Sequence, residues 1–297
     1  MTMSAELALS MPPPQPWDEA AAGWNEHSQV IRDWLRDVTD AMIAAASIGL
    51  GSRVLDIAAG AGDQTLDIAR RIGPTGYVLA TDLSPRILAL AHDNLRAAGF
   101  SNFDTQVADA QALNLAAKKF DAVVSRLGLM FCTEPHLALQ QAHLALRPGG
   151  RFSAVVFSRP EANPCLDIAL RAALKHAQAG QSAINTTAPN PYAPGTLMSL
   201  GKPGLMELLL ANAGFIDIEV RPVAAPFRLP SSRHYAEFVR AAGSPLRAIL
   251  SPLSPPAQAA AWDDMAQQLD QFSAPDGWIG PNELLLCSAT ARRLNGD

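Results

Sequence analysis

Between residues 52 and 158 the chain alternates between short, continuous apolar runs and longer segments whose apolar residues recur at helical spacing. The apolar runs predict β-strands at 53–59, 76–83, 103–110, 120–131 and 151–158. The segments between them predict helices at 63–72, 84–99 and 135–146. Strands that alternate with helices of this length form right-handed βαβ units. The pattern therefore predicts a doubly wound parallel sheet that binds its ligand at the carboxyl ends of the strands.

The regular alternation stops after Ser158. Segments 159–203 and 224–280 contain helical patterns broken by prolines, and we expect both to be helical inserts that roof the site. Segment 204–215 predicts one more helix, 216–223 predicts a strand, and 282–292 predicts the last strand. We therefore expect residues 49–297 to form a single α/β domain with two inserts.

The chain before residue 49 has a different pattern. Four prolines within the first 16 residues predict an extended or mobile arm. Residues 17–48 carry apolar side chains at helical spacing and predict one or two amphipathic helices. We expect residues 1–48 to serve as an arm and helical lid. The arm has neither a basic segment nor a long apolar core, so we expect no signal peptide.

Composition narrows the class of protein. Hydrophobic residues make up 48% of the chain and charged residues 17%, which is typical of a globular protein with a large core. The formal charge of −5, without a cluster of lysines and arginines, argues against a nucleic-acid partner. Cys132, Cys165 and Cys287 are widely spaced in apolar surroundings and predict neither disulfides nor a metal site. No apolar stretch is long enough to span a membrane, so we expect a cytoplasmic protein.

The turn after the first predicted strand, in VLDIAAGAGDQT (54–65), is the most informative motif. It lacks the lysine and hydroxyl residue that follow the glycines of a nucleoside-triphosphate loop. A dinucleotide fold would leave the next helix start free for a pyrophosphate, but here that position holds Asp63. Asp56 adds a second negative charge near the end of the strand. The turn therefore favours a cationic nucleotide ligand such as S-adenosylmethionine, whose ammonium Asp56 and Asp63 can hold directly or through water.

Two further strand ends supply partners for an adenosine. Asp82 ends the second strand, about twenty residues after the glycines, where a carboxylate can accept hydrogen bonds from both ribose hydroxyls. Leu83 follows it and can lie on the adenine face. Asp109 and Ala110 end the third strand, where a carboxylate can accept a hydrogen bond from the adenine amino group.

Together, VLDIAAGAGDQTLDIA, ATDLSP, VADAQAL, FDAVVSRLGLMF and ALRPGGRF resemble the sequential motifs of class I S-adenosylmethionine-dependent methyltransferases. The form D-x-A-x-G-x-G-D resembles the ubiquinone/menaquinone-biosynthesis C-methyltransferase group within that class. The resemblance covers about residues 50–157. It implies a Rossmann-like, seven-stranded sheet in the order 3-2-1-4-5-7-6 with one antiparallel strand.

The resemblance also implies roles for particular residues. It places Asp56, Gly60, Gly62 and Asp63 near the methionyl part of the cofactor, and Arg126 in the cleft beneath the sulfonium. It places Asp82 and Leu83 at the ribose and adenine, and Asp109 and Ala110 at the base. Ala58 occupies a position where many members have the first glycine, and we include it among the cofactor-binding residues.

Candidates outside the motifs are fewer. Trp24, on the N-terminal lid, is expected to line the site. His27 on the same segment is a candidate proton acceptor. His176, on the predicted roof helix, is a second candidate proton acceptor. Met130, after the fourth strand, is a candidate for an apolar substrate wall. No histidines or cysteines have metal-ligand spacing, so we predict no metal.

We therefore predict an enzyme that transfers a methyl group from S-adenosylmethionine to an O, N or activated C atom of a small aromatic or heterocyclic molecule, leaving S-adenosylhomocysteine. The cofactor supplies the reactive group, so the sequence need not show a catalytic residue. An NAD(P)-dependent oxidoreductase and a non-catalytic methyltransferase-like binding protein remain as alternatives. We expect a monomer or homodimer.

Overall fold

The computed structural model describes residue 23 and residues 26–115, 117, 119–179 and 190–292. The predicted arm and Trp24 therefore lie outside the described residues. Within the described chain, a single sheet carries the strands in the order β3-β2-β1-β4-β5-β10-β6. The last strand, β10, pairs antiparallel with both β5 and β6, and the other strands run parallel to one another. This confirms the predicted seven-stranded order with one antiparallel strand.

The strands of the large sheet match the apolar runs of the sequence. They are β1 (Arg53–Ile57), β2 (Tyr77–Asp82), β3 (Phe103–Val107), β4 (Phe120–Arg126), β5 (Leu146–Phe157), β6 (Phe215–Ala224) and β10 (Glu283–Ala291). The central strands β1 and β4 are buried along nearly their whole length because helices cover both faces of the sheet. The edge strand β3 is mostly exposed.

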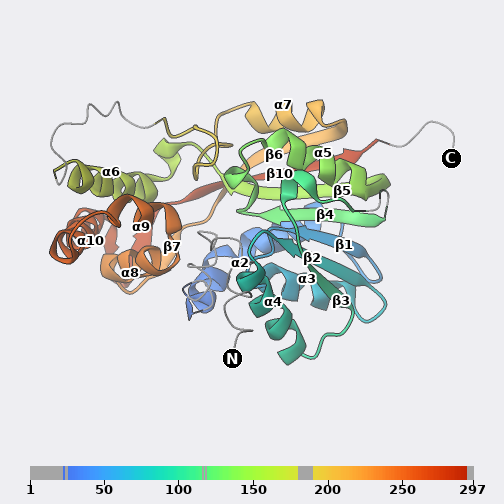
Figure 1. Ribbon diagram of the computed structural model, residues 1–297, viewed down its shortest axis with the longest axis horizontal. Helices are drawn as coiled ribbons and strands as arrows, with labels where there is room; N and C mark the ends of the chain where they lie inside the picture. The colour runs from blue at the N-terminus through green and yellow to red at the C-terminus, as the bar shows by residue number, and fades with distance from the viewer. Residues whose placement is uncertain (1–22, 24–25, 116, 118, 180–189, 293–297) are drawn as a thin grey trace, which may run out of the picture.

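Helices form a layer on each face of the sheet (Figure 1). One layer consists of α2 (Ser28–Ala45), α3 (Asp63–Ile72) and α4 (Pro85–Ala97), which pack side by side, and the other contains α5 (Pro135–Ala145) and α7 (Leu205–Asn212). Local sequence signals set several of these ends. Ser84 caps α4 by accepting a hydrogen bond from the Ile87 amide, and Pro85 takes the first helical position.

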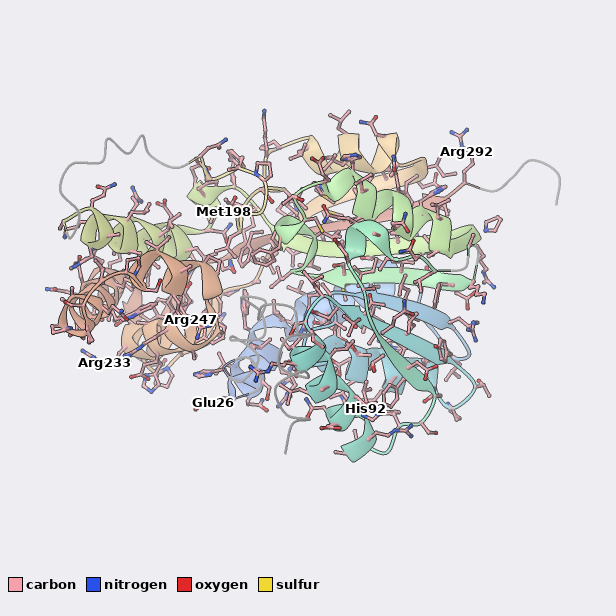
Figure 2. The ribbon with its side chains drawn as sticks, in the orientation of Figure 1. Glu26, His92, Met198, Arg233, Arg247 and Arg292 are labelled. Atoms are coloured by element: carbon pink, nitrogen blue, oxygen red, sulfur yellow. The ribbon has the colours of Figure 1, made fainter. Side chains whose placement is uncertain are left out.

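The two inserts gather beside the sheet rather than over one of its faces (Figure 1). Their helices are α6 (Pro164–Ala179), α8 (Ser232–Ala242), α9 (Ser244–Leu250) and α10 (Pro255–Leu269). The second insert also contains a small sheet of β7 (Phe227–Leu229), β9 (Gly277–Gly280) and β8 (Ser273–Ala274), which the sequence pattern did not predict. These strands are too short to show a periodicity of their own. Met198, labelled in Figure 2, is buried near the junction between this helical group and the sheet.

The helix α2 connects the inserts to the large sheet. Its Trp34 indole donates a hydrogen bond to the carbonyl of Ala225, 2.8 Å away, and stacks on Phe227 with 4.0 Å between ring centroids. Such an offset aromatic pair adds about 0.5–1.5 kcal/mol to the free energy of burial. The N-terminal helix is therefore fixed to the entrance of the second insert.

Candidate active site

A cavity of about 180 Å³ lies at the carboxyl ends of β1, β2, β3 and β4, where the sequence pattern placed the ligand site. The turns that follow these strands supply most of its walls, and α2 adds Leu35. Its other lining residues are Ile57, Ala58, Ala59, Gly60, Ala61, Asp63, Gln64, Asp82, Leu83, Ile87, Ala108, Asp109, Ala110, Gln111, Arg126, Leu127, Gly128, Phe131 and Cys132.

The turn after β1 forms the floor of this cavity and is tightly packed. Gly60 and Gly62 have φ angles of +57° and +88°, a left-handed conformation that glycine adopts without strain. Gly62 is the N-cap of α3 and lies against α4, so a Cβ atom there would be 3.1 Å from the Cα of Ala91. Ala58 has a φ of +57°, which costs an alanine about 1 kcal/mol. The backbone of this turn can therefore approach a ligand closely.

Asp82 links the turn after β1 to the turn after β2 by hydrogen bonds. Its carboxylate accepts hydrogen bonds from the amides of Gly60 and Ser84, each 3.0 Å away. Asp82 lies on the cavity wall, and Leu83 beside it is 43% exposed. The acid at the end of β2 thus both shapes the glycine turn and faces the cavity.

Asp109 and Gln111 line the cavity after the end of β3, the strand next to β2. The Asp109 carboxylate accepts a hydrogen bond from the Gln111 amide at 2.8 Å and so caps the short helix Ala110–Ala112. The Gln111 side-chain oxygen accepts from the amide of Glu134 at 2.7 Å, which joins the turn after β3 to the loop after β4. Cys132 also lines this wall, and burial, together with the Asp109 charge, raises the pKa of its thiol to about 12.

Asp56 lies behind the cavity wall and not on it. Its carboxylate is fully buried and accepts hydrogen bonds from Thr65 Oγ1 at 2.6 Å and Gln64 Nε2 at 3.2 Å. Burial outweighs these bonds and raises the pKa of Asp56 to about 6. Gln64 stands between the carboxylate and the cavity, so the geometry gives Asp56 a supporting position. The sequence did not single out Gln64, although it follows the second acid directly.

Asp63 has partners that the sequence did not reveal. It begins α3, is buried, and forms a 2.9 Å ion pair with Nη1 of Arg32 on α2. Burial raises the pKa of Asp63, and the charges of Arg126 and Arg32 oppose that rise. The two acids at the glycine turn are therefore partly neutralised by arginines, which corrects the sequence argument that they leave a strongly anionic site.

Arg126 is the one basic residue among the described residues that line the cavity. It ends β4, is only 8% exposed, and donates from Nη1 to Thr39 Oγ1 on α2 at 2.7 Å. Burial lowers the pKa of its guanidinium, while the charges of Asp63 and Asp56 raise it. The arginine predicted beneath the cofactor is thus on the cavity wall, fixed to the N-terminal helix.

The remaining predicted residues lie away from the cavity. Met130 is fully buried, and its carbonyl accepts a 2.7 Å hydrogen bond from Ser199, while its neighbour Phe131 faces the cavity. His176 lies 2.9 Å from the Asp264 carboxylate and joins α6 to α10. His27 precedes α2, and its ring nitrogen lies 3.1 Å from the carbonyl of Gly23. Neither histidine is among the residues that line the cavity.

The described chain shows two further absences. Among the residues that the structure describes, no helix combines the length and the apolar character needed to cross a membrane. In the same residues, no group of three or more histidine, cysteine, aspartate or glutamate side chains could hold a metal ion.

The sheet order, the glycine turn after β1 and the acid that ends β2 are the features to compare with known methyltransferases. Residues 54–150 match the family described as "Methyltransferase domain". The structure superposes on a solved candidate methyltransferase of Bacillus halodurans with a TM-score of 0.56 and 19% identity, covering 86% of this chain and 98% of that one. This likeness shows the fold.

Two curated relatives share more sequence identity with this chain over part of its length. The chain is 31% identical over 136 residues to the ubiquinone/menaquinone biosynthesis C-methyltransferase UbiE of Haemophilus ducreyi, covering 46% of this chain and 51% of the relative. It is 37% identical over 119 residues to the protein of the same name from Pseudomonas fluorescens, covering 40% and 46%. The chain thus spans about half the length of these relatives. Residues 54–150 match a methyltransferase domain, and the resemblance to the ubiquinone/menaquinone C-methyltransferase group is confirmed over this part of the chain.

Proposed function

We propose that this protein transfers a methyl group from S-adenosylmethionine to an O, N or activated C atom of a small aromatic or heterocyclic molecule. The observation that carries the proposal is the convergence of the Gly60 turn, Asp82 and Asp109 on one cavity at the ends of three adjacent strands. The match of residues 54–150 to the methyltransferase domain supports it.

The residues of the cavity fit S-adenosylmethionine. Asp82 and Asp109 offer acceptor oxygens, and the glycine turn offers closely approachable backbone. Arg126 is the one cation in the described lining, and it stands on the β4 side of β1, away from Asp82 and Asp109 on the β2 and β3 side. The cofactor has no phosphate and needs no cation beside its adenosine, which agrees with this distribution of charge.

We assign the parts of the cofactor accordingly. Asp82 and Leu83 would hold the ribose and the adenine face, and Asp109 and Ala110 would hold the base. Gly60, Gly62 and Asp63 would lie at the methionyl part, with Ala58 in the turn and Asp56 supporting Gln64 and Thr65 from behind. When bound, the cofactor supplies a methyl group on a sulfonium, so the protein's share is orientation and the exclusion of water.

We further propose that residues 1–48 act as a lid and that the inserts at 159–203 and 224–280 roof the acceptor site. Two contacts of α2 support this organisation: Leu35 lines the cavity and Trp34 packs on the entrance of the second insert. Trp24 remains a proposed part of the lid. His27, His176 and Met130 gain no support from their contacts, and the proposed chemistry does not require them.

The acidic formal charge of −5 and the single basic residue among the described residues that line the cavity favour a small-molecule acceptor over a nucleic acid. We propose a cytoplasmic protein that works as a monomer or a homodimer without a metal. Size-exclusion chromatography with light scattering tests the oligomeric state.

Asp82→Ala tests the cofactor assignment. Hydrogen bonds to a charged group contribute about 1.5–3 kcal/mol, so we expect the variant to bind S-adenosylhomocysteine about 10- to 150-fold more weakly in calorimetry. Asp104→Ala is the matched control, because Asp104 is an exposed acid on the neighbouring strand β3 and is not among the cavity-lining residues. Equal affinity in the wild type and in Asp82→Ala would refute the assignment.

The same measurements separate the alternative functions. A thermal shift with NADH, and none with S-adenosylhomocysteine, would indicate an oxidoreductase instead. Mass spectrometry of small molecules that gain a methyl group in an extract of the source organism tests turnover. Cofactor binding without any methylated product would favour a non-catalytic binding protein.

A further inference from the structure

The edge strand β3 carries backbone hydrogen-bonding groups that no described residue uses. The order of the large sheet ends on β3, and its pairing with β2 keeps one register throughout. Successive residues of a strand direct their backbone groups to opposite sides. The amide of Ala108 donates to the carbonyl of Asp82 on β2, so the even-numbered residues of this segment bond to β2. The free side of β3 therefore carries the N–H and C=O groups of Phe103, Thr105 and Val107.

The other edge of the large sheet is protected against further pairing, and β3 is not. The edge strand β6 contains Pro222, which has no N–H, and Asp217, whose φ of +50° interrupts the extended backbone. Its exposed Glu219 and Arg221 add charges. Prolines, irregular backbone and charges are the features by which natural sheets prevent their edges from pairing. Strand β3 contains neither proline nor lysine, and none of its residues has a positive φ, so this edge is open to a further strand.

A groove beside β3 offers room for the side chains of such a strand. Thr105 and Val107 line it from β3, and α4 lines it from above the sheet. Val107 is apolar and yet 53% exposed. The lining residues on α4 are Pro85, Leu88, Ala89, His92 and Asp93, of which His92 is labelled in Figure 2. The helices of the two inserts lie at the other end of the molecule and leave this edge uncovered (Figure 1).

The sequence of β3 fits a second copy of itself in one antiparallel register. With Thr105 opposite Thr105 of the second copy, Phe103 lies opposite Val107, and every outward N–H and C=O group of the strand finds a partner. Asp104, the one charged residue of the strand, then lies opposite Gln106, whose amide can donate to the carboxylate.

The neighbouring registers fit less well. A shift by two residues in one direction would place Asp104 opposite Asp104 of the second copy, and like charges directly opposite each other destabilise a strand pair. A shift by two residues in the other direction would leave the outward groups of Phe103 without a strand partner. Charge and hydrogen bonding therefore select the register centred on Thr105.

We propose that the protein forms a two-fold symmetric homodimer in which the β3 strands of two copies pair antiparallel about Thr105 and join the two large sheets. A contact that uses the same patch on both copies closes on itself, so it yields a dimer and not a filament. The second copy covers the exposed Val107 and the groove beside α4. The edge that the single chain leaves open is thereby removed.

This arrangement leaves both candidate active sites open. The cavity lies at the carboxyl ends of the strands, and antiparallel pairing places the carboxyl ends of the two β3 strands at opposite ends of the contact. No described residue that lines the groove also lines the cavity. The inference therefore does not rest on the proposed methyl transfer.

Sedimentation velocity of the full chain tests the dimer. A contact built from one short strand and one helix is at the small end of specific interfaces, so we expect a dissociation constant between roughly 1 and 100 μM. The mass of the wild type should rise from that of one chain to that of two across this range of concentration.

Val107→Lys tests the location of the interface, because it places a charge on the open edge. We expect it to raise the dissociation constant at least about tenfold. Ile279→Lys is the matched control: Ile279 is also an exposed β-branched residue in a strand, 40% exposed on β9, and it lies outside the groove. It should leave the dissociation constant unchanged.

Gln106 tests the register, since the two-fold axis makes each change act twice. Gln106→Lys places a cation opposite Asp104 of the second copy and should lower the dissociation constant about threefold to tenfold. Gln106→Asp places a like charge there and should raise it by a similar factor, about threefold to tenfold. Gln140→Lys and Gln140→Asp, on the exposed side of α5, make the same changes in net charge and should have no effect.

Two outcomes would overturn the inference. One is a wild type that keeps the mass of a single chain throughout the range, which would leave the edge of β3 to a strand of another protein. The other is a dimer that Val107→Lys and both Gln106 substitutions leave as tight as the wild type, which would place the interface on another face. Calorimetry with S-adenosylhomocysteine on every variant reports folding and keeps the two proposals apart, because loss of cofactor binding by the wild type refutes the proposed function and not the dimer.

Discussion

The buried acid at the end of β1 makes the stability of this protein depend on pH in a direction opposite to that of most carboxylates. Asp56 is fully buried, and its pKa is raised from the usual 3.8 to about 6. The folded state therefore binds a proton more tightly than the unfolded chain. Between about pH 4 and pH 6, the unfolded state loses this proton before the folded state does, so the free energy of unfolding falls as the pH rises.

The size of the effect follows from the two pKa values. At about 1.4 kcal/mol per pH unit, the difference between the two pKa values corresponds to about 3 kcal/mol in total, of which about 2.4 kcal/mol is lost between pH 4 and pH 7 because the unfolded carboxyl is already partly ionised at pH 4. Asp56→Asn cannot titrate, and its amide oxygen can still accept the hydrogen bond from Thr65. The free energy of unfolding of this variant, minus that of the wild type, should therefore rise by about 2.4 kcal/mol over the same range.

Urea unfolding, followed by tryptophan fluorescence at pH 4, 5, 6 and 7, measures this difference. Asp93→Asn is the control, since the Asp93 side chain is 81% exposed and its removal should leave the shape of the pH profile unchanged. A difference between Asp56→Asn and wild type that stays constant within about 0.5 kcal/mol would refute the reasoning. It would mean that Thr65 and Gln64 stabilise the carboxylate at least as much as burial destabilises it.

Two further substitutions test the packing around the cavity. Gly128→Ala would place a Cβ atom 2.3 Å from the Cβ of Ala58, and we expect it to lower the free energy of unfolding by about 1–3 kcal/mol and to weaken binding of S-adenosylhomocysteine. Gly49→Ala is the control, because a Cβ atom there meets nothing within 4 Å, and it should change the free energy of unfolding by less than about 0.5 kcal/mol. Equal effects of Gly128→Ala and Gly49→Ala in chemical denaturation would contradict this account. Trp34→Phe removes the hydrogen-bond donor to the buried carbonyl of Ala225 and should lower the free energy of unfolding by about 1–2 kcal/mol. Thermal denaturation measures this loss, and an unchanged midpoint would show that water replaces the indole.

The elements of the sheet could be predicted because their signals are local. Apolar runs of strand length, the Ser84 cap with Pro85, and the glycines at 60 and 62 each act within a few residues. The inserts were harder to predict for the same reason. Strands β7 and β8 span only three and two residues, too few to show an apolar pattern of their own. They form because each pairs with β9.

The acids of the candidate site were also visible in the sequence, but their surroundings were not. Asp82 and Asp109 follow apolar runs at the ends of strands, and the structure places both on the cavity wall. Asp56 follows the same kind of run, yet its side chain points behind the wall toward Thr65 and Gln64. Which side of a strand end faces the ligand depends on the packing of the next helix, and the sequence pattern does not specify it.

By itself, the sequence determined the order of strands and helices, the glycine turn and the row of acids at the strand ends, because hydrophobic period, capping and glycine conformation are properties of neighbouring residues. The tertiary structure decided the charge and the shape of the site. Arg126 meets Thr39 across 87 residues, Arg32 meets Asp63 across 31, and Trp34 meets Ala225 across 191. Contacts over such distances exist only once the N-terminal helix has packed against the sheet, so no local pattern could show that two arginines stand among the acids.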